Sequence, residues 1–372
     1  MIKFLSKTNL KKYAGKTALL RIDLNIEPGG ELDSYRLEAV IPTIKLLLKN
    51  KTKIILLSHR GRPGKYEKNY SLAPFGPIFA KKLKTAVDFV YAARTGALEK
   101  VVKNSDAKIV LVENLRFFQG EEANDPSFTR ELAKLGDFFV NDAFAVSHRK
   151  NASVVAITKY LPSYGGLLLE KELKKLGAII NYSAKPFVIV LGGAKVSDKV
   201  GVLKYFWNKA DKFIIAGGPA NTFFLANGLP IGKSFYDKAS LPFVKKFIGS
   251  PKIVLPSDIK VSAKKILDIG PQTINEWSKI IAKSKTIIWN GPIGLFEKKG
   301  FEKGTIATWK AIFANKKAIA VIGGGETLAS LKLITNNSKL ITKNKNLFLS
   351  TGGGAMLEFL SGKKLLGIEA LR

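Results

Sequence analysis

Short apolar runs alternate with amphipathic stretches along most of the chain. The runs are rich in Val, Ile, Leu and Phe and are bounded by turn-forming residues, a pattern that predicts buried β-strands. The predicted strands cover residues 17–22, 53–57, 86–91, 109–112, 138–140, 187–191, 212–216, 252–255, 286–289, 318–322 and 347–349.

Amphipathic segments between these runs predict helices, for example over residues 37–49, 73–83 and 196–210. Apolar strands that alternate with helices are typical of parallel sheets covered on both faces, so the predicted fold class is α/β. Because 372 residues exceed the usual size of a single core, we expect two domains.

A turn-rich segment at residues 161–166 marks the predicted end of the first domain. A helix over residues 167–180 is expected to connect the two halves, and a second turn-rich segment at 181–186 leads into the next series of strands. The predicted domains are therefore residues 1–166 and 181–355, with the helix between them.

Polar residues directly follow several predicted strands. They are Asp23 and Asn25 after the first strand, His59 and Arg62 after the second, Glu113 to Arg116 after the fourth and Asn141-Asp142 after the fifth. Active sites of α/β folds lie at the carboxyl ends of strands, so these side chains are expected at one edge of a sheet. Taken singly, each has a plainer interpretation: Asp23 and Asn25 as turn residues, and His59 as a structural histidine.

The formal net charge of +32 is the most unusual feature of the composition. A strongly basic protein can bind nucleic acid or a membrane surface. Here the lysines are spread from Lys3 to Lys364 without one dominant tract, and no RNA-binding aromatic motif or zinc-finger spacing accompanies them. We favour a lysine-rich surface that attracts small anionic substrates, without a specific nucleic-acid or membrane partner, and keep nucleic-acid binding as the alternative.

The chain has no cysteine, which excludes disulfides, thiolate catalysis and cysteine metal sites. No apolar run reaches 18 residues, and the first residues lack the pattern of a secretory signal. These features predict a cytoplasmic protein.

Arginine is distributed very unevenly. Of the nine arginines, eight lie at or before position 149 and the ninth is Arg372. A guanidinium binds carboxylate or phosphate through two parallel hydrogen bonds, whereas an ammonium acts as a point charge. The first half is therefore expected to hold an arginine-based anion site. Five arginines belong to short polar motifs: Arg36, Arg60, Arg62, Arg116 and Arg149.

The second half has glycine clusters, at residues 192–193, 217–218, 323–325 and 352–354. None matches the P-loop pattern, and a lone pair of glycines is only a turn signal. The cluster at 323–325 is stronger evidence, because it follows an apolar strand and opens a helical pattern where amides can bind phosphate and Glu326 can face a cation. Lys195 and Lys199 are spaced to emerge on one helix face. A second anion site of different chemistry is predicted.

Taken together, these segments resemble the phosphoglycerate kinase family, in the same order from Arg21 to the end of the chain. The motifs that carry the resemblance are Arg21 to Asn25, Ser58 to Pro63, Glu113 to Phe117, Gly120 to Asp125, Val140 to Phe144, His148-Arg149, Gly192 to Lys199, Asp268 to Pro271, Trp289 to Glu297, Gly323 to Thr327 and Ser350 to Ala355.

The resemblance implies reversible phosphoryl transfer from 1,3-bisphosphoglycerate to ADP, giving 3-phosphoglycerate and ATP, with Mg²⁺. It implies two Rossmann-like domains joined by a hinge helix, and a C-terminal tail, residues 356–372, that packs back on the first domain. The first domain would bind phosphoglycerate and the second the nucleotide. The chain is expected to act as a monomer.

The resemblance also implies site residues. Those at the family's phosphoglycerate-binding positions are Asp23, Asn25, Arg36, His59, Arg62, Arg116 and Arg149. Those at positions around the nucleotide are Gly193, Lys195, Lys199, Asn290, Glu297, Gly323, Gly324, Gly325, Glu326 and Thr327. We assign catalysis to Arg36 and Lys195, which would neutralise the transferring group, and the metal contact to Glu326. The attacking substrate carboxylate is already ionised at neutral pH, so no general base is needed.

Four positions depart from the family's pattern. Glu326 replaces the usual aspartate, Arg60 an apolar residue, Pro219 a methionine and Asn151 a histidine. None of these changes removes a charge that the mechanism needs. Two alternatives remain. A non-catalytic relative that binds nucleic acid is disfavoured by the intact motifs. A kinase for another carboxylic acid is disfavoured by the arginine cluster, because the cluster requires a second anionic group on the substrate.

Overall fold

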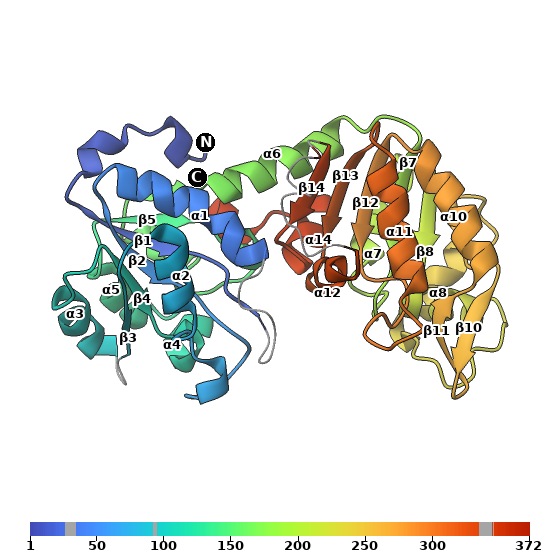
Figure 1. The fold of residues 1–372 in the computed structure, drawn as a ribbon, viewed down its shortest axis with the longest axis horizontal. Coiled ribbons are helices and arrows are strands. Elements are labelled where there is room, and N and C mark those ends of the chain that lie inside the picture. The colour runs from blue at the N-terminus through green and yellow to red at the C-terminus, as the bar shows by residue number, and fades with distance from the viewer. Residues whose placement is uncertain (27–34, 92–94, 335–343, 345) are drawn as a thin grey trace. The chain divides into compact units, whose positions relative to one another are not determined.

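The chain folds into two compact units in the computed structural model, which describes residues 1–26, 35–91, 95–334, 344 and 346–372. Unit 1 comprises Met1–Lys174 together with Lys364–Arg372, and unit 2 comprises Lys175–Lys363 (Figure 1). Each unit is an α/β fold built around its own six-stranded sheet.

The sheet of unit 1 is parallel throughout, in the order β3-β4-β2-β1-β5-β6. Its strands are β1 (Thr17–Arg21), β2 (Lys53–Leu57), β3 (Val87–Val90), β4 (Ile109–Val112), β5 (Phe138–Asn141) and β6 (Ser163–Gly165). Ala18 on β1 pairs with Ile54 on β2 and with Phe138 on β5. Strands β4 and β5 are buried at every position, because helices or loops cover both faces of the sheet.

In the described part of unit 1, six helices lie entirely within this unit. They are α1 (Tyr35–Lys49), α2 (Phe75–Leu83), α3 (Thr95–Lys103), α4 (Gln119–Glu122), α5 (Pro126–Ala133) and α15 (Leu366–Glu369). The apolar faces of α1 and α2 form the main core with β1, β2, β4 and β5, for example through Ile44 and Phe79. Asp125 begins α5, where its carboxylate accepts a hydrogen bond from the Phe128 amide at 2.7 Å.

The main sheet of unit 2 is also parallel, in the order β14-β13-β12-β7-β8-β9. Its strands are β7 (Phe187–Leu191), β8 (Lys212–Ile215), β9 (Ile253–Val254), β12 (Thr286–Asn290), β13 (Ile319–Gly323) and β14 (Leu347–Ser350). A separate antiparallel hairpin joins β10 (Ile259–Ser262) to β11 (Lys265–Ile269).

The helices of unit 2 bury large aromatic side chains. Trp289 of β12 packs against Trp309 with ring centroids 4.7 Å apart, and both are fully buried. Among the described residues, the helices of unit 2 are α7 (Val200–Phe206), α8 (Gly217–Ala226), α9 (Leu241–Val244), α10 (Pro271–Lys283), α11 (Lys303–Ala314), α12 (Gly325–Ala329) and α14 (Gly354–Leu360).

Helix α6 (Leu167–Asn181) contains the boundary between the two units, which falls after Lys174. Two side chains of unit 1 bind the amides at its N-terminus. The Asp142 carboxylate accepts from the Leu169 amide at 3.0 Å, and the Thr43 hydroxyl accepts from the Leu167 amide at 3.1 Å. A Cβ atom at Gly166 would lie 2.1 Å from the Asp142 carboxylate, so only glycine fits there.

The predicted strands are all present with small shifts of their ends, and three further strands are not among the predictions. One is β6, which lies in the segment interpreted as a boundary loop, and the others form the hairpin β10–β11. Two predictions need correction. The helix expected over residues 196–210 begins only at Val200, and residues 354–360 form α14 within unit 2, so the tail that joins unit 1 starts at Lys364 rather than at residue 356.

None of the helices in the described ranges is long and apolar enough to cross a membrane.

Candidate active site

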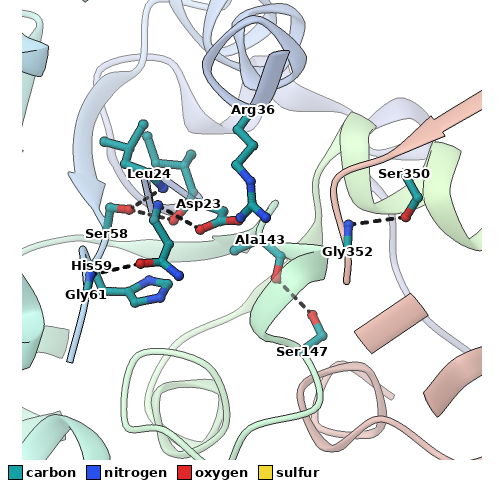
Figure 2. A network of polar contacts seen from close by, with 12 residues as sticks. Asp23, Leu24, Arg36, Ser58, His59, Gly61, Ala143, Ser147, Ser350 and Gly352 are labelled. Atoms are coloured by element: carbon teal, nitrogen blue, oxygen red, sulfur yellow. Dashed lines mark hydrogen bonds and ion pairs between the residues drawn. The ribbon is translucent and has the colours of Figure 1, made fainter. Parts of the chain in front are cut away.

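The loops after β1 and β2 are joined by polar side chains that the sequence places at strand ends. The Arg36 guanidinium, from the first turn of α1, forms an ion pair with the Asp23 carboxylate, which is almost fully buried. Asn25 accepts a hydrogen bond from the Gly61 amide at 2.8 Å and so ties the first loop to the second. Figure 2 shows Arg36 extending toward Asp23, with His59 and Gly61 on the neighbouring loop. Of the predicted residues, Asp23, Asn25, Arg36 and His59 therefore lie together.

His59 is buried at the end of β2, with 1% of its surface exposed. Its Nδ1 atom lies 3.1 Å from an Nη atom of Arg21, which is equally buried. Burial lowers the pKa of His59 well below its ordinary value, and the charges of the surrounding arginines lower it further. The imidazole is therefore neutral over the physiological pH range.

Arg116 is positioned by the two residues that open its motif. The Glu113 carboxylate accepts from the amides of Leu72 and Asn114, at 2.8 and 2.7 Å. The side chain of Asn114 bonds the backbone of Arg60 and accepts from the Arg116 amide at 3.1 Å. Glu113 and Asn114 thus shape the loop and leave the Arg116 guanidinium to contact the Gly61 carbonyl and, at 3.3 Å, the carboxylate of Glu122.

The arginines of this region act on one another electrostatically. Burial, followed by the charge of Arg149, lowers the pKa of Arg116 to about 10. Burial, followed by the charge of Arg62, lowers the pKa of Arg149 as well. Besides burial, the charges of neighbouring arginines contribute to both shifts, so positive charge is concentrated among Arg62, Arg116 and Arg149. Such a cluster is stabilised by an added anion.

The other two predicted arginines differ in exposure. Arg62 is exposed, whereas Arg149 is half-buried, and its Nε atom has no hydrogen-bond partner in the part of the chain that the structure describes. Neither is joined to Asp23 or His59 by a hydrogen bond among the described residues, so only electrostatic interactions connect them to the cluster. A bound anion could be contacted by both side chains.

Arg60, which replaces an apolar residue in the family's pattern, is a structural residue. Its guanidinium is buried and donates to the Ile26 carbonyl at 2.6 Å and to the Ser71 carbonyl at 3.4 Å, and it lies over the ring of Phe75. The apolar stem and the stacked guanidinium fill the space that an apolar side chain would occupy.

In unit 2, the loops after β7, β8 and β12 approach one another closely. Gly218 lies in the first turn of α8, and a Cβ atom there would lie 1.9 Å from the Ala194 carbonyl oxygen. The Gly193 amide donates to the Pro292 carbonyl at 2.8 Å. The glycine clusters at 192–193 and 217–218 therefore serve backbone packing first, and this packing brings several backbone segments to one wall of a pocket.

The pocket next to these loops has a volume of about 600 Å³. Three of the ten predicted nucleotide-binding residues line it: Gly193, Glu297 and Glu326. Apolar side chains make up much of the remaining wall, including Phe224, Pro256 and Leu295. A partly apolar pocket with backbone groups and carboxylates at its rim suits a planar base joined to a polar sugar and phosphates.

Asn290 and Thr327 hold loops next to the pocket in place through hydrogen bonds. The Asn290 side chain donates to the Gly323 carbonyl at 2.9 Å, and the Thr327 hydroxyl accepts from the Gly291 amide at 2.8 Å. Both residues are buried. These two contacts fix the turn at Gly324 against the end of β12.

Lys195 and Lys199 differ from the prediction, because no helix spans them. Lys195 is exposed in the turn that follows β7, while Lys199 is buried just before α7. Burial lowers the pKa of Lys199, and the neighbouring carboxylates of Asp198 and Glu326 partly oppose this shift. The two ammonium groups therefore have different surroundings and are expected to have different roles.

Some residues of the two sites were not among the predicted ones. Arg21, Ser153 and Glu121 form a buried polar chain behind His59, and the apolar pocket residues of unit 2 look like core positions in the sequence. Arg21 could have been singled out from the sequence, because it is an arginine at the end of a predicted strand and belongs to a motif. Nothing in the sequence distinguishes Phe224 or Leu295 from core residues.

An arginine cluster on one α/β unit and a glycine-walled pocket on another are features of a two-domain α/β phosphotransferase. The family model described as phosphoglycerate kinase matches residues 8–363 of the chain. The phosphoglycerate kinase of Chloroflexus aggregans is 40% identical over 393 residues, which cover 97% of each chain. The chain belongs to the phosphoglycerate kinase family.

Solved structures of phosphoglycerate kinases are also similar to this chain. The phosphoglycerate kinase of Coxiella burnetii is 34% identical, with a TM-score of 0.78 over 100% of this chain and 99% of that one. That of Pyrococcus horikoshii OT3 is 30% identical, with a TM-score of 0.87 over 100% and 98%. The predicted resemblance, the fold class with two parallel sheets and the enzyme class are confirmed: the chain is a kinase.

Proposed function

We propose that the arginine cluster of unit 1 binds the phosphate end of 3-phosphoglycerate and of 1,3-bisphosphoglycerate. The observation that carries this proposal is the grouping of Arg62, Arg116 and Arg149, in which the Nε atom of Arg149 has no hydrogen-bond partner among the described residues. Besides burial, the charges of Arg149 and Arg62 lower the pKa of Arg116, and the charge of Arg62 lowers that of Arg149, effects that a bound anion would relieve. Arg62 adds an exposed guanidinium near the same charges. Asp23, Asn25 and His59 would bind the hydroxyl and carboxyl end of the substrate.

The pocket of unit 2 would bind ADP or ATP. Its apolar wall around Phe224 and Leu295 suits the base, and Glu297 would accept from ribose hydroxyls. The turn at Gly323–Gly325 would offer backbone amides to phosphate oxygens. Because α12 has only five residues, we attribute this contribution to individual amides rather than to a helix macrodipole.

The reaction is reversible transfer of a phosphoryl group from the acyl phosphate of 1,3-bisphosphoglycerate to ADP. In the reverse direction an ionised substrate carboxylate attacks, so catalysis depends on alignment and charge neutralisation. Arg36 from unit 1 and Lys195 from unit 2 would neutralise the transferring group. Because the two substrates bind to different units, transfer requires a hinge motion that brings them together and excludes water.

Glu326 is the residue proposed to contact Mg²⁺. It lies exposed at the pocket rim, close enough to Lys199 to influence its pKa. Within the described ranges, no three His, Asp or Glu side chains are grouped to hold a metal. This fits Mg²⁺, which takes one or two carboxylates and completes its shell with phosphate oxygens and water. When bound, the ion would neutralise charge on the nucleotide phosphates.

A coupled assay of the purified chain with 3-phosphoglycerate and Mg-ATP tests the proposed function. ADP formation that depends on both substrates is expected. Glycerate, which lacks the phosphate, is the control, because the arginine cluster should reject it. Equal activity with glycerate would favour the alternative of a kinase for another acid, and absence of transfer together with tight nucleic-acid binding at physiological salt would favour the non-catalytic alternative.

Arg116→Lys is expected to weaken 3-phosphoglycerate binding about tenfold, because lysine keeps the charge and loses the planar fork. The loss should be measured by calorimetry, where the stability of the variant can be checked separately. Arg130→Lys, a change on the exposed surface of α5, is the matched control. Wild-type affinity in the Arg116 variant would mean that shape-specific recognition by this guanidinium is not used.

Glu326→Gln is expected to raise the Mg²⁺ concentration needed for half-maximal activity and to lower kcat about tenfold, because a neutral amide is a poorer magnesium ligand. Glu326→Asp should keep most of the activity. Titration of activity with Mg²⁺ compares the three proteins. If the Gln variant has the wild-type magnesium dependence and kcat, Glu326 only interacts with the start of α12, an effect of about 0.3–1 kcal/mol on stability.

A further inference from the structure

A buried polar chain lies directly behind His59. Arg21, the last residue of β1, donates from Nε to the Ser153 hydroxyl at 2.9 Å. Ser153 in turn donates from its hydroxyl to Glu121 at 2.7 Å and from its amide at 3.0 Å. All three residues are almost completely buried. Two further contacts complete the environment of Arg21: one Nη atom donates to the Ile22 carbonyl, and the other lies 3.1 Å from Nδ1 of His59.

The contact between Arg21 and His59 determines which ring nitrogen carries the proton. A guanidinium has five N–H donors and no acceptor, so Nδ1 of His59 must be the acceptor. A protonated imidazolium would have donors at both nitrogens and could not form this contact. The neutral ring with its proton on Nε2 is the one form that satisfies the geometry.

The other ring nitrogen is the one available to a ligand. Nε2 of His59 is buried and has no hydrogen-bond partner among the residues that the structure describes. A buried donor without an acceptor is unfavourable, so an oxygen acceptor is expected to occupy this position when substrate binds. Asp23, whose loop is bonded to that of His59 through Asn25 and Gly61, marks the same region as the proposed substrate site.

We propose that Arg21 is a positioning residue, which holds His59 as the neutral tautomer with its proton on Nε2 and so directs one hydrogen-bond donor at the bound phosphoglycerate. Ser153 and Glu121 hold the Arg21 guanidinium in place, and Glu121 balances its charge. This inference rests on the proposed substrate site of unit 1.

Charge alone does not account for this arrangement. Arg36, Arg116 and Arg149 also act on His59 and, with burial, keep its ring neutral. Asp23 and Glu121 are the carboxylates that act on Arg21 from the neighbouring loops. These long-range charges disfavour the imidazolium without selecting a nitrogen. The direct hydrogen bond from Arg21 is what determines which ring nitrogen of His59 carries the proton.

The chain has only two histidines, His59 and His148, so their ring nitrogens can be observed directly by NMR after ¹⁵N-histidine labelling. Comparison with the His59→Gln spectrum assigns the His59 signals. In the wild-type enzyme without substrate, we expect a protonated Nε2 and an unprotonated Nδ1, unchanged over the physiological pH range. A proton on Nδ1, or titration of the ring within this range, would overturn the proposal without any variant being needed.

Arg21→Gln should convert His59 to a mixture of tautomers and raise the KM for 3-phosphoglycerate about tenfold with a smaller change in kcat. Arg21→Lys, which keeps a donor, should restore the Nε2–H tautomer at least in part. Ser153→Ala, which removes only the support, should broaden the signals less than Arg21→Gln does. If the tautomer of the Gln variant is unchanged, the positioning role is wrong.

Titration with 3-phosphoglycerate separates this inference from the proposed function. The Nε2–H signal of His59 should shift on binding. Binding by calorimetry without any change at Nε2 would overturn the role of His59 as a substrate donor while leaving the substrate site intact. Absence of binding, with the tautomer as expected, would contradict the proposed site itself and with it the direction of this donor toward substrate.

Discussion

Replacing Lys195 by alanine is expected to lower kcat about a hundredfold and to change the KM for Mg-ATP little. Lys195 is exposed in the turn between β7 and α7, and the two residues before it, Gly193 and Ala194, line the proposed nucleotide pocket of unit 2. In the proposed mechanism its ammonium group follows the transferring phosphoryl group. Loss of a charge contact made mainly in the transition state costs about 3 kcal/mol and appears in kcat.

Lys199→Ala is the informative contrast, because the two lysines are four residues apart and differ in environment. Lys199 is buried, and the carboxylates of Asp198 and Glu326 interact with it. Its loss is expected to act on nucleotide affinity and on stability, with a smaller change in kcat. Steady-state kinetics of both variants, with Lys195→Arg as the charge-preserving control, provide the test. A Lys195→Ala enzyme within a factor of two of the wild-type kcat would contradict the assigned role.

Strand positions were predictable because parallel strands buried on both faces are continuous apolar runs. Strands β2, β4 and β7 begin and end at the predicted residues. The three missed strands lack that signal. Ser163, Tyr164 and Gly165 of β6 form a short edge strand next to a turn, and β10 is exposed along most of its length. A periodicity analysis does not detect strands that are as short as β6 or as exposed as β10.

For the helix after β7, the sequence pattern predicted too long an element instead of missing one. Its apolar pattern extends back to Val196, which is buried, but the chain between Lys195 and Lys199 follows a turn held by the hydrogen bond from the Ser197 amide to Asp237. Asp237 lies far away in the sequence, so this tertiary contact could not be inferred from the local pattern. The predicted common helix face for the two lysines was wrong for this reason.

Residues of the candidate sites could be predicted from the sequence where they are charged or directly follow a predicted strand. Asp23, Asn25 and His59 lie together because their loops follow adjacent parallel strands, and Arg36 contacts Asp23 from the first turn of α1. The burial of Arg60 could not be predicted from the sequence. Arg60 belongs to the same polar motif as His59 and Arg62, yet its guanidinium binds backbone carbonyls and an aromatic face. Only the three-dimensional contacts distinguish an arginine that stabilises the fold from one that is available to bind a ligand.

The stability of unit 1 is expected to fall as pH rises, because of Asp142. Its carboxylate is fully buried at the N-terminus of α6, and burial raises its pKa from 3.8 to about 7, although the Thr43 hydroxyl and the amides of Leu169 and Leu168 act in the opposite direction. The folded state therefore keeps a proton that the unfolded chain releases above about pH 4. Stability decreases between about pH 4 and 7 and then levels off, a loss of about 2–3 kcal/mol between pH 5 and 8.

Asp142→Asn should remove this pH dependence, because an amide stays neutral and its oxygen can still accept from the Leu169 amide. Urea unfolding at about pH 5 and 8, followed by circular dichroism, compares the two proteins. All four tryptophans lie in unit 2, so tryptophan fluorescence provides an internal reference that reports the other unit. We expect the variant to gain stability relative to the wild type at the higher pH and to differ much less at the lower one. Equal pH dependence in both proteins would show that the Asp142 carboxylate is ionised when folded, and that the amides at the start of α6 outweigh its burial.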